Sequence, residues 1–246
     1  MEYTAELELL QEEIEYPDSD GEPMAESDFQ RKPLTYAVEA LDIYFRDRSD
    51  VYVSGNMLLY YHKGNRRAVV APDVFVVIGV EKRLRRSYLL WQEEKAPNFV
   101  LEITSESTAH IDQGAKKGLY ARLGVQEYFQ YDPTSDYLAP ALQGLTLVDD
   151  HYLPLPGQTL ADGTLQIYSP KLALALQLTS DGVFHFMDLS TGHVLHTYAE
   201  EVTARQAAEV RAATAEAQVK EEVTARQALE ARLAELEAHL RSLTEK

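Results

Sequence analysis

The sequence predicts a mixed α/β fold, of the α+β kind, around a sheet with both parallel and antiparallel strands. Two short apolar runs, Val74–Ile78 and Phe99–Ile103, are rich in valine, isoleucine and phenylalanine and are typical of buried strands. A third run, Glu127–Tyr131, follows a segment with helical spacing. Strand, helix and strand within this length predict a crossover between parallel strands. Hydrophobic residues make up 45% of the 246 residues, which is enough for a core.

A helix and a set of antiparallel strands are predicted before these runs. Apolar residues at positions i, i+4, i+7 and i+11 indicate an amphipathic helix over Pro33–Arg46, with the proline in its first turn. Val51–Val53 and Met57–Tyr61 have the composition of strands. Gly64 lies in a turn signal after the second of them. We therefore expect an antiparallel meander that leads to Asp73.

The crossover segment carries three polar side chains at helical spacing. Asp112, Lys116 and Tyr120 are four residues apart, so a helix brings them to one face. Gly124 is a plausible end of this helix. By itself, the Asp112–Lys116 spacing is also compatible with an ordinary surface ion pair.

Each of the two buried strands carries a carboxylate. Asp73 lies just before the first run, and Glu102 lies near the end of the second. A buried carboxylate is costly unless it is paired or binds a cation. The chain has no cysteine, so a metal site would use oxygen and imidazole ligands, which favours Mg²⁺ or Mn²⁺.

The chain changes character after Pro133. Hairpin signals at Asp149 and Gly182 predict a β-rich extension over residues 136–198, without a catalytic constellation. Residues 199–246, in which EEVTARQA occurs twice, are expected to form a helical tail. Leucines from Leu229 to Leu243 then alternate steps of four and three residues, which is a coiled-coil seam. The tail predicts a homo-oligomer, most simply a dimer, or packing on another partner.

The charge distribution is uneven. The net charge of −17 does not favour nucleic-acid binding, but eleven acids and no Lys or Arg lie in an acidic N-terminal arm over residues 1–30. Residues 62–86 are basic and surround Asp73. The segment could contact a DNA backbone or form a solvated loop. Its basic residues are Lys63, Arg66, Arg67, Lys82, Arg83, Arg85 and Arg86.

Targeting signals are not evident. No run of 18 apolar residues predicts a transmembrane helix, and no basic region followed by an apolar stretch begins the chain. With no cysteines, the sequence fits the reducing cytoplasm, and no membrane partner is expected.

Five motifs in order resemble one known family. They are P-D at Pro72-Asp73, E-x-T at Glu102–Thr104, D-x-x-x-K-x-x-x-Y at Asp112–Tyr120, L-G-V-x-E-Y at Leu123–Tyr128 and D-P at Asp132-Pro133. The ordered set is similar to the Uma-two group of restriction endonucleases, within the PD-(D/E)XK nuclease superfamily, over roughly residues 16–195. The resemblance implies a restriction-endonuclease-like core over residues 31–135.

The resemblance also implies roles for single residues. Asp73 and Glu102 would hold a divalent ion, Mg²⁺ or Mn²⁺. The superfamily's strand lysine would stand at Thr104, and the resemblance moves its role to Lys116, although Lys117 is adjacent. Supporting residues would be Thr104, Asp112, Tyr120 and Glu39 of the first helix, where a glutamate is otherwise simply solvated.

Three functions remain open from the sequence. The first is a metal-dependent endonuclease that hydrolyses DNA, in which Lys116 assists the attacking water. The second is a non-catalytic binding or assembly protein with a nuclease fold that acts through its coiled-coil tail. The third is a metal-dependent hydrolase of another phosphoester.

Overall fold

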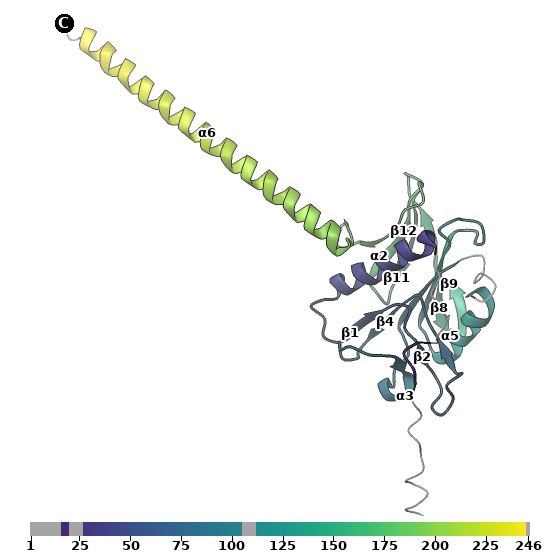
Figure 1. Cartoon of the computed structure of the whole chain (residues 1–246). Coiled ribbons are helices and arrows are strands. Elements are labelled where there is room, and N and C mark those ends of the chain that lie inside the picture. Colours follow the sequence, from purple (N-terminus) through teal and green to yellow (C-terminus); the bar gives the residue numbers. More distant parts are fainter. Residues whose placement is uncertain (1–15, 20–26, 105–111, 245–246) are drawn as a thin grey trace, which may run out of the picture. The chain divides into compact units, whose positions relative to one another are not determined.

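A six-stranded mixed sheet lies at the centre of the computed structural model of the protein (Figure 1). Its strand order is β1-β4-β6-β7-β8-β9. The three predicted buried strands, β4 (Val74–Ile78), β6 (Phe99–Ile103) and β7 (Glu127–Tyr131), have the predicted bounds. β6 and β7 are parallel, whereas the other neighbouring pairs of this sheet are antiparallel. The mixed α/β class and the parallel crossover are therefore confirmed.

The structure describes residues 16–19, 27–104 and 112–244. The chain divides into two compact units, residues 1–197 and 198–246. The helices are α2 (Asp28–Tyr44), α3 (Leu90–Glu93), the π-helix η1 (Asp112–Lys116), α5 (Lys117–Leu123) and α6 (Tyr198–Thr244). The remaining strands are β1 (Val51–Ser54), β2 (Leu59–Tyr60), β3 (Val69–Val70), β5 (Tyr88–Leu89), β8 (Leu142–Val148), β9 (His151–Pro154), β10 (Gly157–Thr159), β11 (Leu165–Ser169), β12 (Leu174–Leu178), β13 (Phe184–Asp188) and β14 (His193–Val194).

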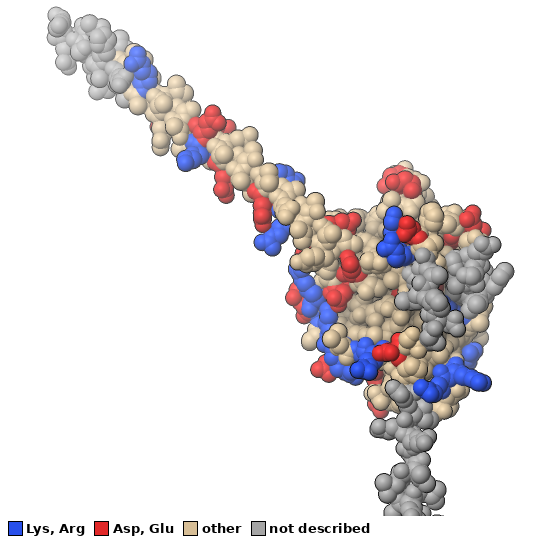
Figure 2. Space-filling view, in the orientation of Figure 1, with Lys and Arg blue, Asp and Glu red and all other residues tan. Residues whose placement is uncertain are grey.

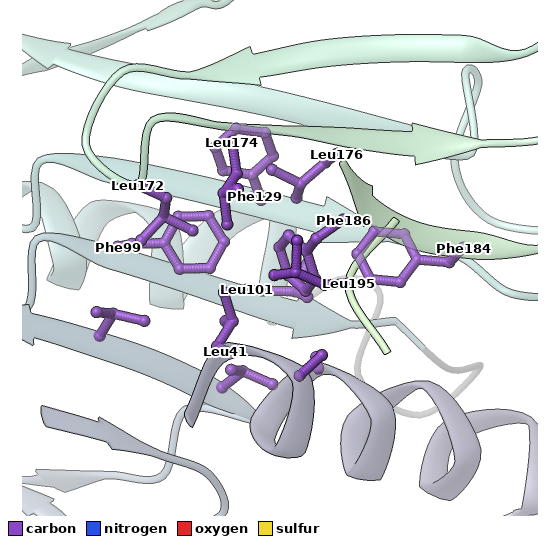
Figure 3. Packing of buried hydrophobic residues seen from close by; sticks show 14 of the residues in the cluster. Leu41, Phe99, Leu101, Phe129, Leu172, Leu174, Leu176, Phe184, Phe186 and Leu195 are labelled. Atoms are coloured by element: carbon purple, nitrogen blue, oxygen red, sulfur yellow. The ribbon is translucent and has the colours of Figure 1, made fainter. Parts of the chain in front are cut away.

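One face of the six-stranded sheet packs against α2 and a five-stranded antiparallel sheet of order β10-β11-β12-β13-β14 (Figure 3). Leu41 comes from α2, Leu101 from β6 and Phe129 from β7. Leu176 and Phe186 come from the five-stranded sheet. All five are buried, and the cluster of apolar side chains to which they belong forms the larger part of the core.

The opposite face is also covered. Val100 and Tyr128 of the six-stranded sheet pack with Tyr120 of α5 and with Leu59 and Tyr88 of a small sheet of order β3-β2-β5. A sheet that is buried on both faces explains why its central strands are almost continuously apolar. Side chains alternate between the two faces, so Glu102 lies on the same face as Val100, beneath α5.

The first helix begins earlier than predicted. α2 starts at Asp28, where the Ser27 carbonyl accepts the N–H groups of Gln30 and Arg31. Asp28 pairs with Arg31 at 2.7 Å and suits the positive end of the helix dipole. Pro33 therefore lies inside the helix. Because proline has no N–H, one carbonyl in the preceding turn lacks its usual donor, but this turn is near the exposed start of the helix.

The predicted meander is divided between two sheets. β1 pairs with β4, whereas β2 pairs with β3 across the Gly64 turn in the small sheet. Gly55 lies at the break, and a Cβ atom there would be 2.5 Å from the carbonyl oxygen of Asp73. Next to it, the Asn56 N–H donates to the Pro72 carbonyl at 3.0 Å. The Gly55 bend therefore holds the backbone that precedes Asp73.

Both predicted hairpins of the β-rich extension are present, but in different sheets. β8 and β9 pair from Val148 and His151 and continue the six-stranded sheet beside β7. β12 and β13 pair from Leu178 and Phe184 within the five-stranded sheet. Residues 142–154 are thus an integral part of the central sheet. Between β4 and β6, residues 79–98 contain the short β5 and α3 and are otherwise irregular.

A second buried glutamate, Glu127, joins the two large sheets. Its carboxylate accepts hydrogen bonds from the Ser169 hydroxyl and from the backbone N–H of Lys171 at 3.0 Å. Burial raises the pKa of Glu127, and the bonds from Ser169 and Lys171 only partly oppose this. The glutamate of the L-G-V-x-E-Y motif thus anchors the fold from the face opposite to Glu102.

We expect Glu127 to make stability depend on pH. A carboxyl group whose pKa is raised in the folded state stabilises fully at low pH, and this contribution is lost as pH rises through the raised pKa. Melting curves from about pH 4.5 to about pH 7 should show wild type losing stability relative to Glu127→Gln. A difference between the two proteins that stays constant over this range would contradict the prediction.

The second unit is the helix α6, which confirms a long helical tail. Leu229, Leu233 and Leu236 are 72%, 60% and 49% exposed along it. The coiled coil and the oligomer remain predictions. None of the described helices contains an apolar stretch long enough to cross a lipid bilayer.

Candidate functional site

The site is centred on Glu102, a carboxylate that is 0% exposed within β6. Lys116 Nζ lies 2.8 Å from Glu102 Oε2, and the Tyr120 hydroxyl donates to Glu102 Oε1 at 2.5 Å. The Lys116 side chain is 19% exposed, so the ion pair lies at the boundary between core and solvent. Both Glu102 oxygens are thus oriented by donors from the helix above the sheet.

The crossover helix positions both donors. The π-helix η1 ends at Lys116 and runs directly into α5, and such π segments are frequent at functional sites. Gly124 ends α5 with a φ of 80°, and the Val125 N–H returns to the Tyr120 carbonyl. Lys116 and Tyr120 therefore share the predicted face. The side chain of Asp112, predicted to accompany them, lies outside the described residues.

Lys116 is the lysine that faces the sheet. Among the described residues, Lys117 makes no ion pair, whereas Lys116 reaches Glu102. Consecutive helical residues point about 100° apart, so the two ammonium groups do not reach the same carboxylate. The geometry matches the choice of Lys116 over Lys117.

Asp73 adjoins Glu102 at the end of the neighbouring strand. The β4–β6 register pairs Val74 with Leu101, so the next position places Asp73 opposite Glu102. Asp73 Oδ2 accepts the backbone N–H of Ile103 at 2.7 Å. Two carboxylates from adjacent strands therefore lie side by side, as predicted.

The pKa of Tyr120 reflects this environment. Burial raises it well above its ordinary value, and the nearby negative charges of Glu102 and Asp73 raise it further. The phenol thus keeps its proton at neutral pH and remains a hydrogen-bond donor to Glu102.

Gln30 of α2 reaches the site, whereas Glu39 does not. Gln30 Nε2 lies 3.4 Å from the carbonyl oxygen of Ile103, the residue after Glu102. Glu39 is exposed and nine residues further along α2, which is about 13 Å along the axis and about half a turn around it. In the structure α2 thus brings Gln30, and not Glu39, to the strand that carries Glu102. Gln30 was missed because the predicted helix began after it.

Two further polar side chains lie on the same face of the sheet. Thr104 follows β6, and Gln130 of β7 is paired with Glu102 across the parallel strands. They are 2% and 3% exposed. Within the described structure, Thr104 Oγ1 and Gln130 Nε2 have no hydrogen-bond partner. Thr104 thus presents an uncharged, buried hydroxyl two residues after Glu102.

The donor atoms of the site suit a hard divalent cation. Asp73, Glu102 and the Ile103 carbonyl offer oxygen ligands, and Mg²⁺ commonly binds through one or two carboxylates with water completing its shell. The described residues contain no group of three or more His, Cys, Asp or Glu side chains that could hold an ion. A cation here would therefore rest on two carboxylates, of which Glu102 is also paired with Lys116.

The predicted basic segment divides into paired and unpaired residues. Arg85 is 2% exposed in its side chain, lies 2.8 Å from Glu93 and stacks at 4.2 Å over the Tyr52 ring. Arg83 also pairs with Glu93, and Lys82 pairs with Asp42. The Arg85 guanidinium is thus buried between Glu93 and Tyr52, a position that does not favour its predicted contact with DNA.

The other basic residues of the segment are available at the surface. Arg66, Arg67 and Arg86 are exposed and form no ion pair among the described residues. Figure 2 shows Lys and Arg gathered mainly over the lower part of the first unit, with some acidic side chains beside them. An interface with phosphates would use these exposed arginines.

Replacing Arg85 with alanine should destabilise the protein by about 3 kcal/mol, because Glu93 loses its buried partner. Because Arg83 still pairs with Glu93, the expected loss of stability lies at the low end of the range for breaking a buried ion pair. Chemical denaturation measures the free energy of unfolding. The exposed Arg86 is the matched control, and Arg86→Ala should change it by less than about 0.5 kcal/mol. Equal effects of the two substitutions would contradict the structural role of Arg85.

The chain matches a known protein family and is similar to a solved structure. The family model Uma2, described as "Putative restriction endonuclease", matches residues 2–179. No curated protein matches the chain. A solved structure, described as "a putative nuclease belonging to DUF820" from Anabaena variabilis, is 13% identical with a TM-score of 0.41. The match covers 63% of this chain and 81% of that chain.

Proposed function

The chain belongs to the Uma2 family of restriction endonucleases, and from this premise we propose that it is a metal-dependent endonuclease that hydrolyses DNA phosphodiester bonds. The observation that carries the proposal is the contact of Lys116 with Glu102 beside Asp73. A lysine distant in sequence from the strand reaches a buried carboxylate at the place where the superfamily's strand lysine is replaced by Thr104.

The proposed roles follow from the geometry. Asp73, Glu102 and the Ile103 carbonyl would hold Mg²⁺ or Mn²⁺, and the bound ion would supply water activation and neutralisation of phosphate charge. Lys116 Nζ orients the attacking water and stabilises the negative charge that develops on the phosphate. Tyr120 keeps Glu102 Oε1 in a fixed orientation through its hydrogen bond.

DNA would be held through its phosphates. Arg66, Arg67 and Arg86 are the exposed arginines that can contact the backbone, with Arg83 and Lys82 as partly paired neighbours. Such contacts neutralise phosphate charge and release counterions, so affinity should fall as salt rises.

Plasmid cleavage tests the proposal. Supercoiled DNA should be relaxed or linearised with Mg²⁺ and remain intact with a chelator. Asp73→Asn should cleave at least about 100-fold more slowly, although its amide oxygen can still accept the Ile103 N–H and preserve the fold. Equal cleavage by wild type and Asp73→Asn would contradict the site.

A second candidate is an assembly protein that keeps the nuclease fold without catalysis. The exposed leucines Leu229, Leu233 and Leu236 favour it, because an apolar seam on a long helix suits association with a second copy. Light scattering of the full chain and of residues 1–197 would show whether α6 sets the oligomeric state. Oligomers without metal-dependent cleavage would favour this second function.

A further inference from the structure

Two buried polar groups beside Glu102 have no evident role in the fold. Gln130 Nε2 and Thr104 Oγ1 lack a hydrogen-bond partner within the described residues, and both side chains are more than nine-tenths buried. Buried donors are almost always paired, because losing water without a replacement bond destabilises the folded state. Two buried polar groups without hydrogen-bond partners next to a carboxylate call for a functional explanation.

The sheet register brings both groups to the site. Gln130 is the cross-strand partner of Glu102, so the two side chains lie on one face with their strands about 4.8 Å apart. Thr104 is two residues beyond Glu102 and continues the ladder by donating its N–H to the Tyr131 carbonyl at 2.7 Å. Asp73 flanks Glu102 on the side of β4, and Gln130 flanks it on the side of β7.

Gln130 Nε2 makes no hydrogen bond to Glu102, although the two residues are cross-strand partners. Tyr120 and Lys116 already occupy Glu102 Oε1 and Oε2. Lys116 is the partly exposed member of the group, so the site opens towards solvent along its side chain. An oxygen atom that enters when Lys116 turns towards the substrate would meet an amide donor and a hydroxyl.

We propose that Gln130, assisted by Thr104, is a positioning residue that binds an oxygen atom of the reacting complex beside Glu102. This inference rests on the proposed endonuclease function. An amide N–H requires an acceptor, and a hydroxyl can donate or accept. The matching ligand is an oxygen from the hydration shell of the cation or from a DNA phosphate. The two sources share this chemistry and differ in whether DNA must be present.

Gln130→Leu and Thr104→Val test the proposal because they remove the unpaired group and keep similar shapes. Without the buried unpaired group, the metal-free protein should melt at the same temperature as wild type or up to about 2–4 °C higher. Mn²⁺ affinity measured by calorimetry should fall about tenfold if the oxygen belongs to the cation's shell. If it belongs to a phosphate, DNA affinity measured in Ca²⁺ should fall by a similar factor instead.

Gln143 is the matched control. It is the β8 partner of Gln130 on the same face, but its amide already donates to the Pro140 carbonyl at 3.2 Å. Gln143→Leu should leave both affinities unchanged. If Gln130→Leu binds Mn²⁺ and DNA like wild type, this inference is overturned while the proposed function stands. If wild type binds neither Mn²⁺ nor DNA, the proposed function fails and the inference falls with it.

Discussion

Lys116→Ala should slow metal-dependent cleavage of DNA by about 10²–10⁴-fold, the range for losing a group that assists proton transfer. The structure places Lys116 Nζ 2.8 Å from Glu102 Oε2, within reach of a water or phosphate oxygen that a cation at the same carboxylate would hold. Its removal takes away a cation that acts on the reaction while leaving Asp73 and Glu102 in place. Plasmid cleavage at saturating Mg²⁺ measures the rate.

The same substitution should separate catalysis from cation binding. Lys116 competes with a metal ion for Glu102, so Mn²⁺ affinity in Lys116→Ala should be equal to that of wild type or higher. Without metal the variant should lose stability, by up to about 3–5 kcal/mol, because a buried carboxylate loses its cationic partner. Added Mn²⁺ should restore much of this loss by replacing the missing charge.

Lys117→Ala is the control for Lys116, since Lys117 carries the same charge on the adjacent helical position. It should cleave, bind Mn²⁺ and melt like wild type. Normal cleavage by Lys116→Ala, or a loss of cleavage in Lys117→Ala alone, would show that the lysine is wrongly assigned.

Glu102→Gln should reduce cleavage by at least about 100-fold, because it removes a proposed metal ligand and the negative charge that holds Lys116. The amide oxygen can still accept the Tyr120 hydroxyl. Lys116 loses its partner but reaches solvent, so the expected destabilisation is modest, about 1–3 kcal/mol. Cleavage assays and thermal melting measure the two effects.

Glu127→Gln offers a matched comparison with Glu102→Gln. Both glutamates are fully buried in adjacent strands, but they lie on opposite faces of the sheet. Glu127 anchors Ser169 and the backbone of Lys171, so its amide variant should alter stability and keep cleavage. Loss of cleavage in both variants at a temperature where both are folded would indicate a general effect on the sheet.

Local patterns predicted the centre of the fold well. β4, β6 and β7 have the predicted bounds because burial on both faces makes these short strands rich in large apolar side chains, with few polar residues among them. The sheet to which each strand belongs was not predictable from local patterns. β1 and β2 are separated by one bend at Gly55, yet long-range pairing sends β1 to β4 and β2 to the small sheet.

The candidate site was predictable where its residues lie on or beside the central strands and the crossover helix that follows them. Asp73, Glu102, Lys116 and Tyr120 come together because the crossover folds its helix over the strand. Contacts with more distant elements were not predictable. Gln30 meets Ile103 across 73 positions.

The burial of one basic residue was not predictable from the sequence for the same reason. Arg85 lies in a run of arginines that looks like a phosphate-binding loop. Its guanidinium is instead taken up by Tyr52 and Glu93, which a local charge count does not reveal. Arg86, the next residue, stays exposed.

Calorimetric titration of the metal-free wild-type protein with Mn²⁺ is the most direct test that Asp73 and Glu102 form a cation site. One ion per chain should bind, and the heat of binding should disappear in the Asp73→Asn variant while its fold is retained. Absence of binding to folded wild type, or unchanged binding to folded Asp73→Asn, would contradict the site.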